Sequence, residues 1–158
     1  MKQPKFKEHI EPLIKQFLED KVHQVRMETI KCLVRLKNES FDLEWLEATI
    51  EERLQDLHKN PRFALRIHTL FIVNELQSQV TDPFLNEKMY KQAMKRLADD
   101  PVPNIRFNYA KTSPCIYRRL TNSNKMDISD NLKKMAESDP DFDVKFYAAK
   151  AMSEIQIK

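Results

Sequence analysis

The feature that most constrains this chain is a motif that occurs four times at an almost constant step. Each copy contains an apolar residue followed by a cation, namely Val25-Arg26, Leu65-Arg66, Ile105-Arg106 and Val144-Lys145, so that the steps are 40, 40 and 39 residues. Six residues before the cations stand, in order, Asp20, Asn60, Asp100 and Asp139, and a proline follows the last three of these. A period of this length indicates similar units stacked side by side.

Each period also contains two amphipathic stretches, one on either side of the motif. In the first period, apolar residues from Ile10 to Leu18 recur at i, i+3, i+4 and i+7, which predicts a helix over about residues 6 to 19. A second stripe begins at Val25. Two helices and a tight turn in about 40 residues are typical of HEAT and armadillo repeats. We therefore predict an all-α fold, an α-solenoid of about four HEAT repeats of antiparallel helices in a right-handed superhelical stack.

These repeats account for the whole chain, and we expect a single domain over residues 1–158. The units should cover approximately residues 4–38, 40–80, 83–121 and 125–158. Ser40 or Asp42 is suited to cap the second unit, and Asp82 with Pro83 to start the third. Pro114 falls inside a predicted helix, where we expect a kink because proline has no amide hydrogen to donate.

Composition narrows the range of functions. The sequence has no glycine, which disfavours phosphate-binding loops and dinucleotide folds. Its net charge of +3, from 27 cations and 24 acids, is too mild to indicate nucleic-acid binding. No secretory signal or apolar run of membrane-spanning length is present, and Cys32 and Cys115 lie in helical patterns, so we expect buried free thiols. These features predict a soluble protein of the cytoplasm, and also of the nucleus.

The sequence contains no recognisable catalytic or metal-binding pattern. The histidines show no HExxH or other paired spacing on one helical face, and they are His9, His23, His58 and His68. No serine stands in a nucleophile elbow, and the carboxylates are spread over helix surfaces. We therefore expect no enzyme activity, no catalytic residue, no metal site and no cofactor.

The polar residues of the motif suit a structural role. An acid at the end of one helix can bond free amides of the turn, and the cation at the start of the next can reach an acid of its own or the neighbouring unit. We predict a ladder of charges that sets the stacking register, formed by Asp20, Arg26, Arg66, Asp100, Arg106, Asp139 and Lys145. Each contact in this ladder between a cation and an acid of neighbouring units is called a rung. Asn60 and Lys145 should weaken two of the rungs.

The turns within units should line up along one ridge of such a solenoid and be free to bind a partner. The turn residues that we expect to contact a partner are Val22, His23, Arg62, Phe63, Val102 and Pro103. Phe63 and Phe142 are apolar residues at turn positions. Each ring could either fold back against its own helix as a staple or serve as an exposed anchor.

Several stretches resemble the last HEAT repeats of the scaffold (A, or PR65-type) subunit of protein phosphatase 2A. They are residues 44–45 (EW), 60–66 (NPRFALR), 100–108 (DPVPNIRFN) and 139–146 (DPDFDVKF), in the order found in that family. The resemblance implies a scaffold that holds the serine/threonine phosphatase catalytic subunit through the turns within repeats. By position, those contacts fall on Val22, His23, Arg62, Phe63, Val102 and Pro103, and Trp45 resembles a core residue.

The resemblance does not cover the early repeats with which this family holds regulatory subunits, so we do not expect regulatory-subunit binding. The first helix should also present an uncovered edge at Ile10, Leu13 and Phe17, through which the chain could associate with itself. A HEAT adaptor for tubulin, transport cargo or a translation factor would use the same turns and is the alternative function. The charge pattern predicts no nucleic-acid partner, and the hydropathy predicts no membrane partner.

Overall fold

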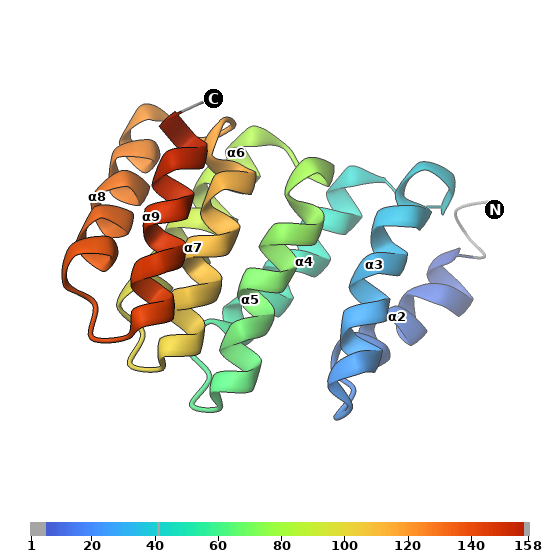
Figure 1. The fold of residues 1–158 in the computed structure, drawn as a ribbon. Coiled ribbons are helices and arrows are strands. Elements are labelled where there is room, and N and C mark those ends of the chain that lie inside the picture. The colour runs from blue at the N-terminus through green and yellow to red at the C-terminus, as the bar shows by residue number, and fades with distance from the viewer. Residues whose placement is uncertain (1–5, 41, 157–158) are drawn as a thin grey trace.

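Helices stand side by side along the whole described chain (Figure 1). The computed structural model describes residues 6–40 and 42–156, although not the side chains of residues 7 and 36–40. All regular elements within these ranges are helical, which confirms the predicted all-α solenoid. In chain order they are η1 (Phe6–Ile10), α2 (Glu11–Leu18), α3 (His23–Ser40), α4 (Leu43–Leu57), α5 (Phe63–Leu76), η2 (Gln77–Gln79), α6 (Asp82–Phe84), η3 (Leu85–Met94), η4 (Lys95–Asp99), α7 (Pro103–Tyr117), α8 (Asn122–Ser138) and α9 (Phe142–Gln156).

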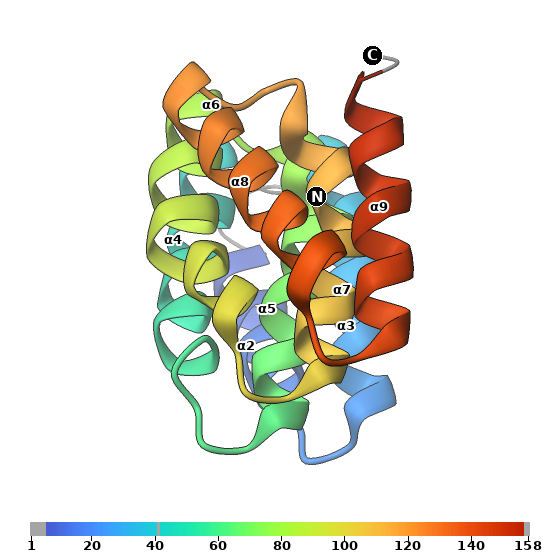
Figure 2. The ribbon, with the colours of Figure 1, turned by 60° about the vertical axis from the view of Figure 1, so that its left-hand side comes forward.

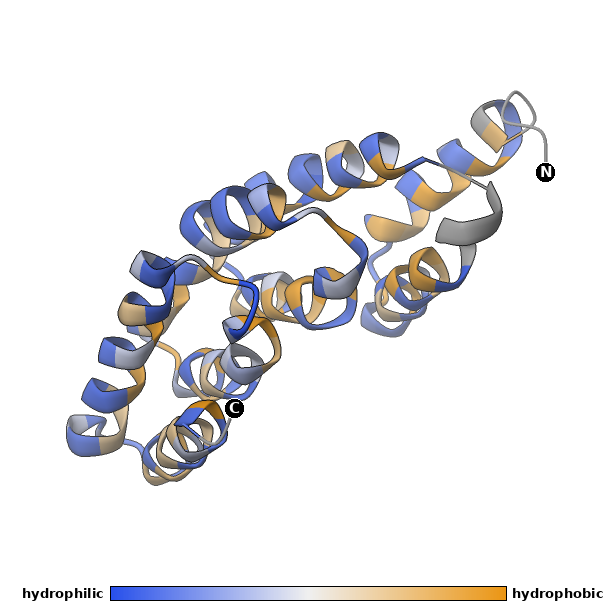
Figure 3. Cartoon of the chain, turned by 90° about the horizontal axis from the view of Figure 1, so that it is seen from above, coloured by the Kyte–Doolittle hydropathy of each residue, from blue (hydrophilic) through white to orange (hydrophobic). Residues whose placement is uncertain are grey.

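The helices form antiparallel pairs in two curved rows. The pairs are α2 with α3, α4 with α5, the continuous segment α6–η3–η4 with α7, and α8 with α9 (Figures 1 and 2). Seen from above, the first members of the pairs form the outer row, and α3, α5, α7 and α9 form the inner, concave row (Figure 3). The turns within pairs all lie at the lower edge of Figure 1, and the connections between pairs lie at its upper edge.

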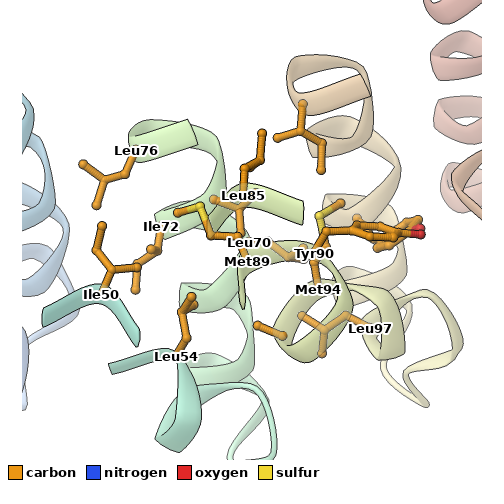
Figure 4. Packing of buried hydrophobic residues seen from close by; sticks show 14 of the residues in the cluster. Ile50, Leu54, Leu70, Ile72, Leu76, Leu85, Met89, Tyr90, Met94 and Leu97 are labelled. Carbon is orange, nitrogen blue, oxygen red and sulfur yellow. The ribbon is translucent and has the colours of Figure 1, made fainter. Parts of the chain in front are cut away.

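The apolar stripes pack between the two rows as one continuous core. Figure 4 shows its middle part, where Ile50 and Leu54 of α4 face Leu70 and Ile72 of α5, with Met89 of η3 beside them. These five side chains are at most 3% exposed. Burial of apolar area contributes about 25 cal/mol per Å², so this core is the main source of stability.

Two helix starts show which of the possible capping residues is used. Asp42 caps α4 by accepting a hydrogen bond from the Trp45 amide at 2.8 Å, as predicted, while the side chain of Ser40 lies outside the described residues. The third pair differs from the prediction, since Thr81 rather than Asp82 is the cap. The Thr81 hydroxyl accepts from the Phe84 amide at 3.3 Å, which makes Asp82 the first helical residue. A β-hydroxyl one residue earlier thus replaces the carboxylate as the acceptor.

Helix α7 continues through Pro114 to Tyr117. The proline ring is buried, so it packs into the core that the rest of α7 also contacts. Because proline has no amide hydrogen, the carbonyl of Ala110 lacks the donor that the next helical turn would normally supply. Packing of the ring offsets part of that loss.

The two cysteines correct another expectation, because both are exposed rather than buried. Cys115 lies on an exposed face of α7. Cys32 occupies a position of the inner helices that is buried in the later pairs, where Ile72 and Ala151 are 2% and 3% exposed. Cys32 belongs to the first described pair, which no other described pair precedes. As for membranes, none of the helices in the described ranges combines the length and hydropathy needed to cross a bilayer.

Candidate functional site: the turn ridge and the ladder beneath it

The four turns within pairs share one hydrogen-bond pattern. In each, the side-chain oxygen of the motif residue accepts from the backbone amide two residues later, and the four oxygens belong to Asp20 (2.7 Å), Asn60 (3.0 Å), Asp100 (3.0 Å) and Asp139 (2.9 Å). This local bond mimics a backbone turn and needs no residue with positive φ. The described backbone accordingly contains none. The motif can therefore close its turns without glycine.

The motif cation ties each turn to its own pair. The Nη1 group of the arginine donates to the main-chain carbonyl six residues earlier, at 2.6 Å from Arg26 to Asp20, 2.8 Å from Arg66 to Asn60 and 2.7 Å from Arg106 to Asp100. This carbonyl lies at the end of the preceding helix, where acceptors have no helical donor. The arginine thus joins the start of the second helix to the end of the first.

The other guanidinium nitrogens reach the next pair. Arg66 donates through Nε and Nη2 to the two carboxylate oxygens of Asp100 at 2.6 and 2.9 Å, and Arg106 makes the same fork with Asp139 at 2.7 and 2.8 Å. The four side chains are 5–12% exposed. Two-pronged, largely buried pairs of this kind are stronger and more specific than ordinary surface ion pairs. They fix the second pair of helices to the third and the third to the fourth.

The pKa values of Asp100 and Asp139 are consistent with the hydrogen bonds that these carboxylates accept from the arginines. Burial raises the pKa of Asp100, but the hydrogen bonds from Arg66 and from the Val102 amide outweigh it, so the net pKa is below the ordinary range. The hydrogen bonds from Arg106 lower the pKa of Asp139, against a smaller effect of burial. Both carboxyl groups are therefore charged near neutral pH, as the rungs require.

The rung between the first and second pairs is different. Asn60 has no charge to offer, and Arg26 instead directs Nε to Nδ1 of His68 in α5 at 3.2 Å. His68 is 1% exposed, and its Nε2 lies 2.6 Å from Nδ1 of His23 at the start of α3. An Nε2-protonated His68 satisfies these two contacts, since its Nδ1 accepts from Arg26 while its Nε2 donates to His23. In this tautomer the longer approach of Arg26 Nη2 to Nε2, at 3.4 Å, is not a hydrogen bond. The polar chain Arg26–His68–His23 replaces the ion pair.

This environment keeps His68 neutral. Burial lowers its pKa to about 3, with further lowering by the charges of Arg26, His23 and Arg53. The imidazole rings of His23 and His68 pack edge to face, with their centroids 4.7 Å apart. The sequence offered no signal for this pair, because His23 and His68 are separated by a full step and five further residues.

The predicted ladder is therefore incomplete. Two rungs, Arg66–Asp100 and Arg106–Asp139, are ion pairs. Arg26 contacts a histidine instead of an acid, because Asn60 stands at the acceptor position. Among the described residues, neither Asp20 nor Lys145 forms an ion pair, and no described helix pair precedes α2 and α3 or follows α8 and α9.

The predicted contact residues along the turn ridge differ in how much of each side chain is exposed to solvent. Val22 is 49% and Phe63 48% exposed, and Arg62 and Pro103 are exposed as well. Val102 is half-buried and packs against the core. The ring of His23 lies at the ridge but is held by His68. Neither aromatic turn residue is buried as a staple, because Phe142 is 79% exposed and Phe63 retains almost half its surface.

The inner row carries an aromatic group that was not predicted. The rings of Phe107 and Tyr147 lie 4.6 Å apart and nearly perpendicular, and the Lys111 amine lies 5.1 Å from the Phe107 centroid. Phe146, not Tyr147, stands one step of 39 residues after Phe107, so the period alone did not indicate this contact. The ring pair joins α7 to α9 beside the Arg106–Asp139 rung.

Comparison with known proteins gives a consistent result. No family model matches the chain. The chain is 32% identical over 127 residues to the A-type regulatory subunit of protein phosphatase PP2A from Saccharomyces cerevisiae, and 32% identical over 63 residues to its counterpart from Schizosaccharomyces pombe. The first match covers 75% of this chain and 20% of the yeast protein, and the second covers 40% and 10%. Together with the helical repeats, these matches are consistent with a HEAT-repeat protein similar to part of the A-type regulatory subunit of protein phosphatase PP2A, although the chain spans a fifth or less of the length of these relatives.

Proposed function

We propose that this chain is a non-catalytic scaffold whose turn ridge holds the catalytic subunit of a serine/threonine phosphatase, in the cytoplasm. The binding residues would be Val22, His23, Arg62, Phe63, Val102 and Pro103. The observation that carries the proposal is the exposure of Val22 and Phe63 at the ridge, in turns whose arginines, Arg26 and Arg66, bond to the end of the preceding helix. Val22 and Phe63 are free for a partner, while Arg26 and Arg66 are engaged in contacts within the stack.

Two further features support this assignment. The similar yeast proteins are named as regulatory subunits of a phosphatase. The ridge is also held rigidly, because each turn is closed by its own side-chain bond and three are tied back by an arginine. A pre-organised surface loses little conformational entropy on binding. Since the matches span a fifth or less of the relatives, the proposal does not extend to their regulatory partners.

The test is a titration of the purified chain with purified protein phosphatase 2A catalytic subunit, followed by calorimetry. We expect Phe63→Ala to weaken binding about tenfold or more, as the loss of a central aromatic anchor does. Pro103→Asp should weaken it as well, by placing an unpaired charge in the contact. Met126→Ala is the matched control, because Met126 is 67% exposed but lies near the start of α8, at the opposite end of that helix from the turn.

The outcomes separate the alternatives. If neither ridge variant weakens binding, the ridge is not the contact surface. If the wild-type chain does not bind the catalytic subunit, the scaffold proposal is wrong. Capture of tubulin, a transport protein or a translation factor by the same turns would then favour the adaptor alternative.

A further inference from the structure

The inner helices carry a row of apolar side chains that are only partly buried. Each motif cation is followed directly by an apolar residue, and these are Met27, Ile67, Phe107 and Phe146. The first three are half-buried and belong to α3, α5 and α7 of the concave row (Figure 3). Because packed helices lie about 8–10 Å apart, this row repeats at about that interval from one inner helix to the next.

A hollow opens beside this row, between three of the inner helices. It has a volume of about 270 Å³ and is lined by residues of α3, α5 and α7 alone, so it opens on the concave face. Met27, Ile67 and Phe71 belong to its apolar lining, and Asn74 and Asn108 to its polar lining. No acid is among the described residues that line it. An enclosed cavity of about 150 Å³ holds a benzene molecule, so this hollow has room for one large apolar side chain.

A lysine stands between this hollow and a second, smaller one. Lys111 of α7 lines both, and the second hollow, of about 100 Å³, lies between α7 and α9. Tyr147 and Lys150 also line the second hollow. The Lys111 amine lies 5.1 Å from the ring centroid of Phe107 and 5.6 Å from that of Tyr147, while the Lys150 amine lies 5.9 Å from the Tyr147 centroid. The two hollows, joined at Lys111, form one concave groove that extends from α3 to α9.

The concave groove is basic. Lys111 forms no ion pair with any described residue, although described helix pairs flank its own pair on both sides, so its free charge does not depend on where the chain begins or ends. One acid, Glu154, lines the groove, and it follows Lys150 by one helical turn. With two amines and one carboxylate, the groove attracts a negatively charged partner. The aromatic rings hold the Lys111 amine in position, which reduces the entropy lost when an anion binds.

We propose that the concave groove binds an extended acidic segment of a partner protein, with one apolar residue in the larger hollow and carboxylates at Lys111 and Lys150. A polyproline II segment repeats every three residues, over about 9.3 Å, which matches the spacing of the helices that it crosses. An apolar residue followed by acids three and six residues later therefore reaches successive inner helices. The side-chain amide nitrogens of Asn74 and Asn108 are already engaged, so their oxygens can accept hydrogen bonds from the peptide N–H groups of the segment.

This groove is distinct from the turn ridge. Of the six residues proposed to hold the phosphatase, His23 also lines the larger hollow, where its ring is held by His68. The acidic segment can therefore bind while the ridge is occupied, and the proposal does not rest on phosphatase binding. A nucleic-acid strand is disfavoured, because its affinity comes mainly from phosphates neutralised by many cations and the groove has two lysines.

The proposal is tested by fluorescence anisotropy with a labelled peptide of about ten residues that carries leucine, glutamate and glutamate at every third position. We expect a dissociation constant below about 100 μM for the wild-type chain. Lys111→Gln, which removes the charge, and Met27→Gln, which keeps the side-chain length, should each weaken binding about fivefold or more. Lys133→Gln is the matched control, because Lys133 is an exposed lysine on α8 of the outer row. Far-UV circular dichroism verifies that each variant is folded.

Each outcome supports or overturns the proposal. A wild-type dissociation constant above about 100 μM, or equal affinity for a peptide with glutamine in place of both glutamates, overturns it. Binding that Lys111→Gln and Met27→Gln leave unchanged places the peptide elsewhere and also overturns it. Tighter binding of an oligouridine of about ten nucleotides, lost in Lys111→Gln, would assign the groove to single-stranded RNA instead. The assay contains no phosphatase, so its failure is distinguishable from failure of the scaffold proposal.

Discussion

Acidification from about pH 7 to about pH 5 should destabilise this protein through His68. The pKa of His68 is lowered from 6.5 to about 3 in the folded chain, mainly by burial. Below pH 6.5 the unfolded chain therefore takes up a proton that the folded chain does not bind. The stabilisation is complete above the unfolded pKa and is lost progressively as the pH falls toward the folded value.

The size of the effect follows from the two pKa values. At pH 5 the unfolded histidine lies 1.5 pH units below its pKa of 6.5 while the folded one remains neutral. One unit corresponds to about 1.36 kcal/mol, so the free energy of unfolding should fall by about 2 kcal/mol. No discount for solvent screening applies, because His68 is 1% exposed.

The assay is urea denaturation at the two pH values, followed by far-UV circular dichroism, for the wild type and for His68→Asn. Asparagine places an oxygen near the position of Nδ1, so Arg26 keeps an acceptor while the titrating group is removed. The variant should lose about 2 kcal/mol less than the wild type over this range. His9→Asn, the same substitution at an exposed histidine, is the control. An equal pH dependence in wild type and His68→Asn would refute the reasoning.

Two further predictions concern single substitutions and use the same denaturation assay. Asp139→Asn should cost about 3 kcal/mol because it leaves the buried Arg106 guanidinium without its charge partner, while Asp99→Asn, in a pair 67–69% exposed, should cost less than about 1 kcal/mol. An equal cost at the two sites would contradict the role of burial. Pro114→Ala should stabilise the chain by about 1 kcal/mol, since the restored amide contributes more than the lost ring packing, whereas Pro103→Ala, in the first turn of α7, should not stabilise it. A destabilised Pro114→Ala variant would show that the ring packing is the larger effect.

The sequence carried most of the information about the fold. An almost constant step fixes which residues become neighbours in a stack. Arg106 lies six residues after the acid of its own motif copy and 33 residues before the acid of the next copy, and these positions already indicate both of its partners. The same reasoning extends to exposure. Cys32 was expected to be buried because its helical stripe is apolar, but burial in a stack also depends on having a neighbour on each side.

The Arg26–His68–His23 chain could not be predicted in this way. It arises because one carboxylate is replaced by Asn60, after which the arginine takes another acceptor within reach. That acceptor is specified by the three-dimensional approach of α3 and α5, not by a spacing in the sequence. The cap at Thr81 escaped prediction for a more local reason, since two adjacent side chains can each accept the same kind of bond.

The replacement of one charged rung by a chain of neutral hydrogen bonds has a mechanical consequence. A solenoid responds to a bending force at its most compliant joint, and here the joints between α5 and α7 and between α7 and α9 are braced by forked ion pairs. At the joint between α3 and α5, the corresponding brace runs through His68. Bending should therefore occur mainly between α3 and α5, so that the first helix pair tilts as a rigid body relative to the other pairs. A partner that binds the turns at Val22 and Phe63 together would fix the angle between the first and second pairs.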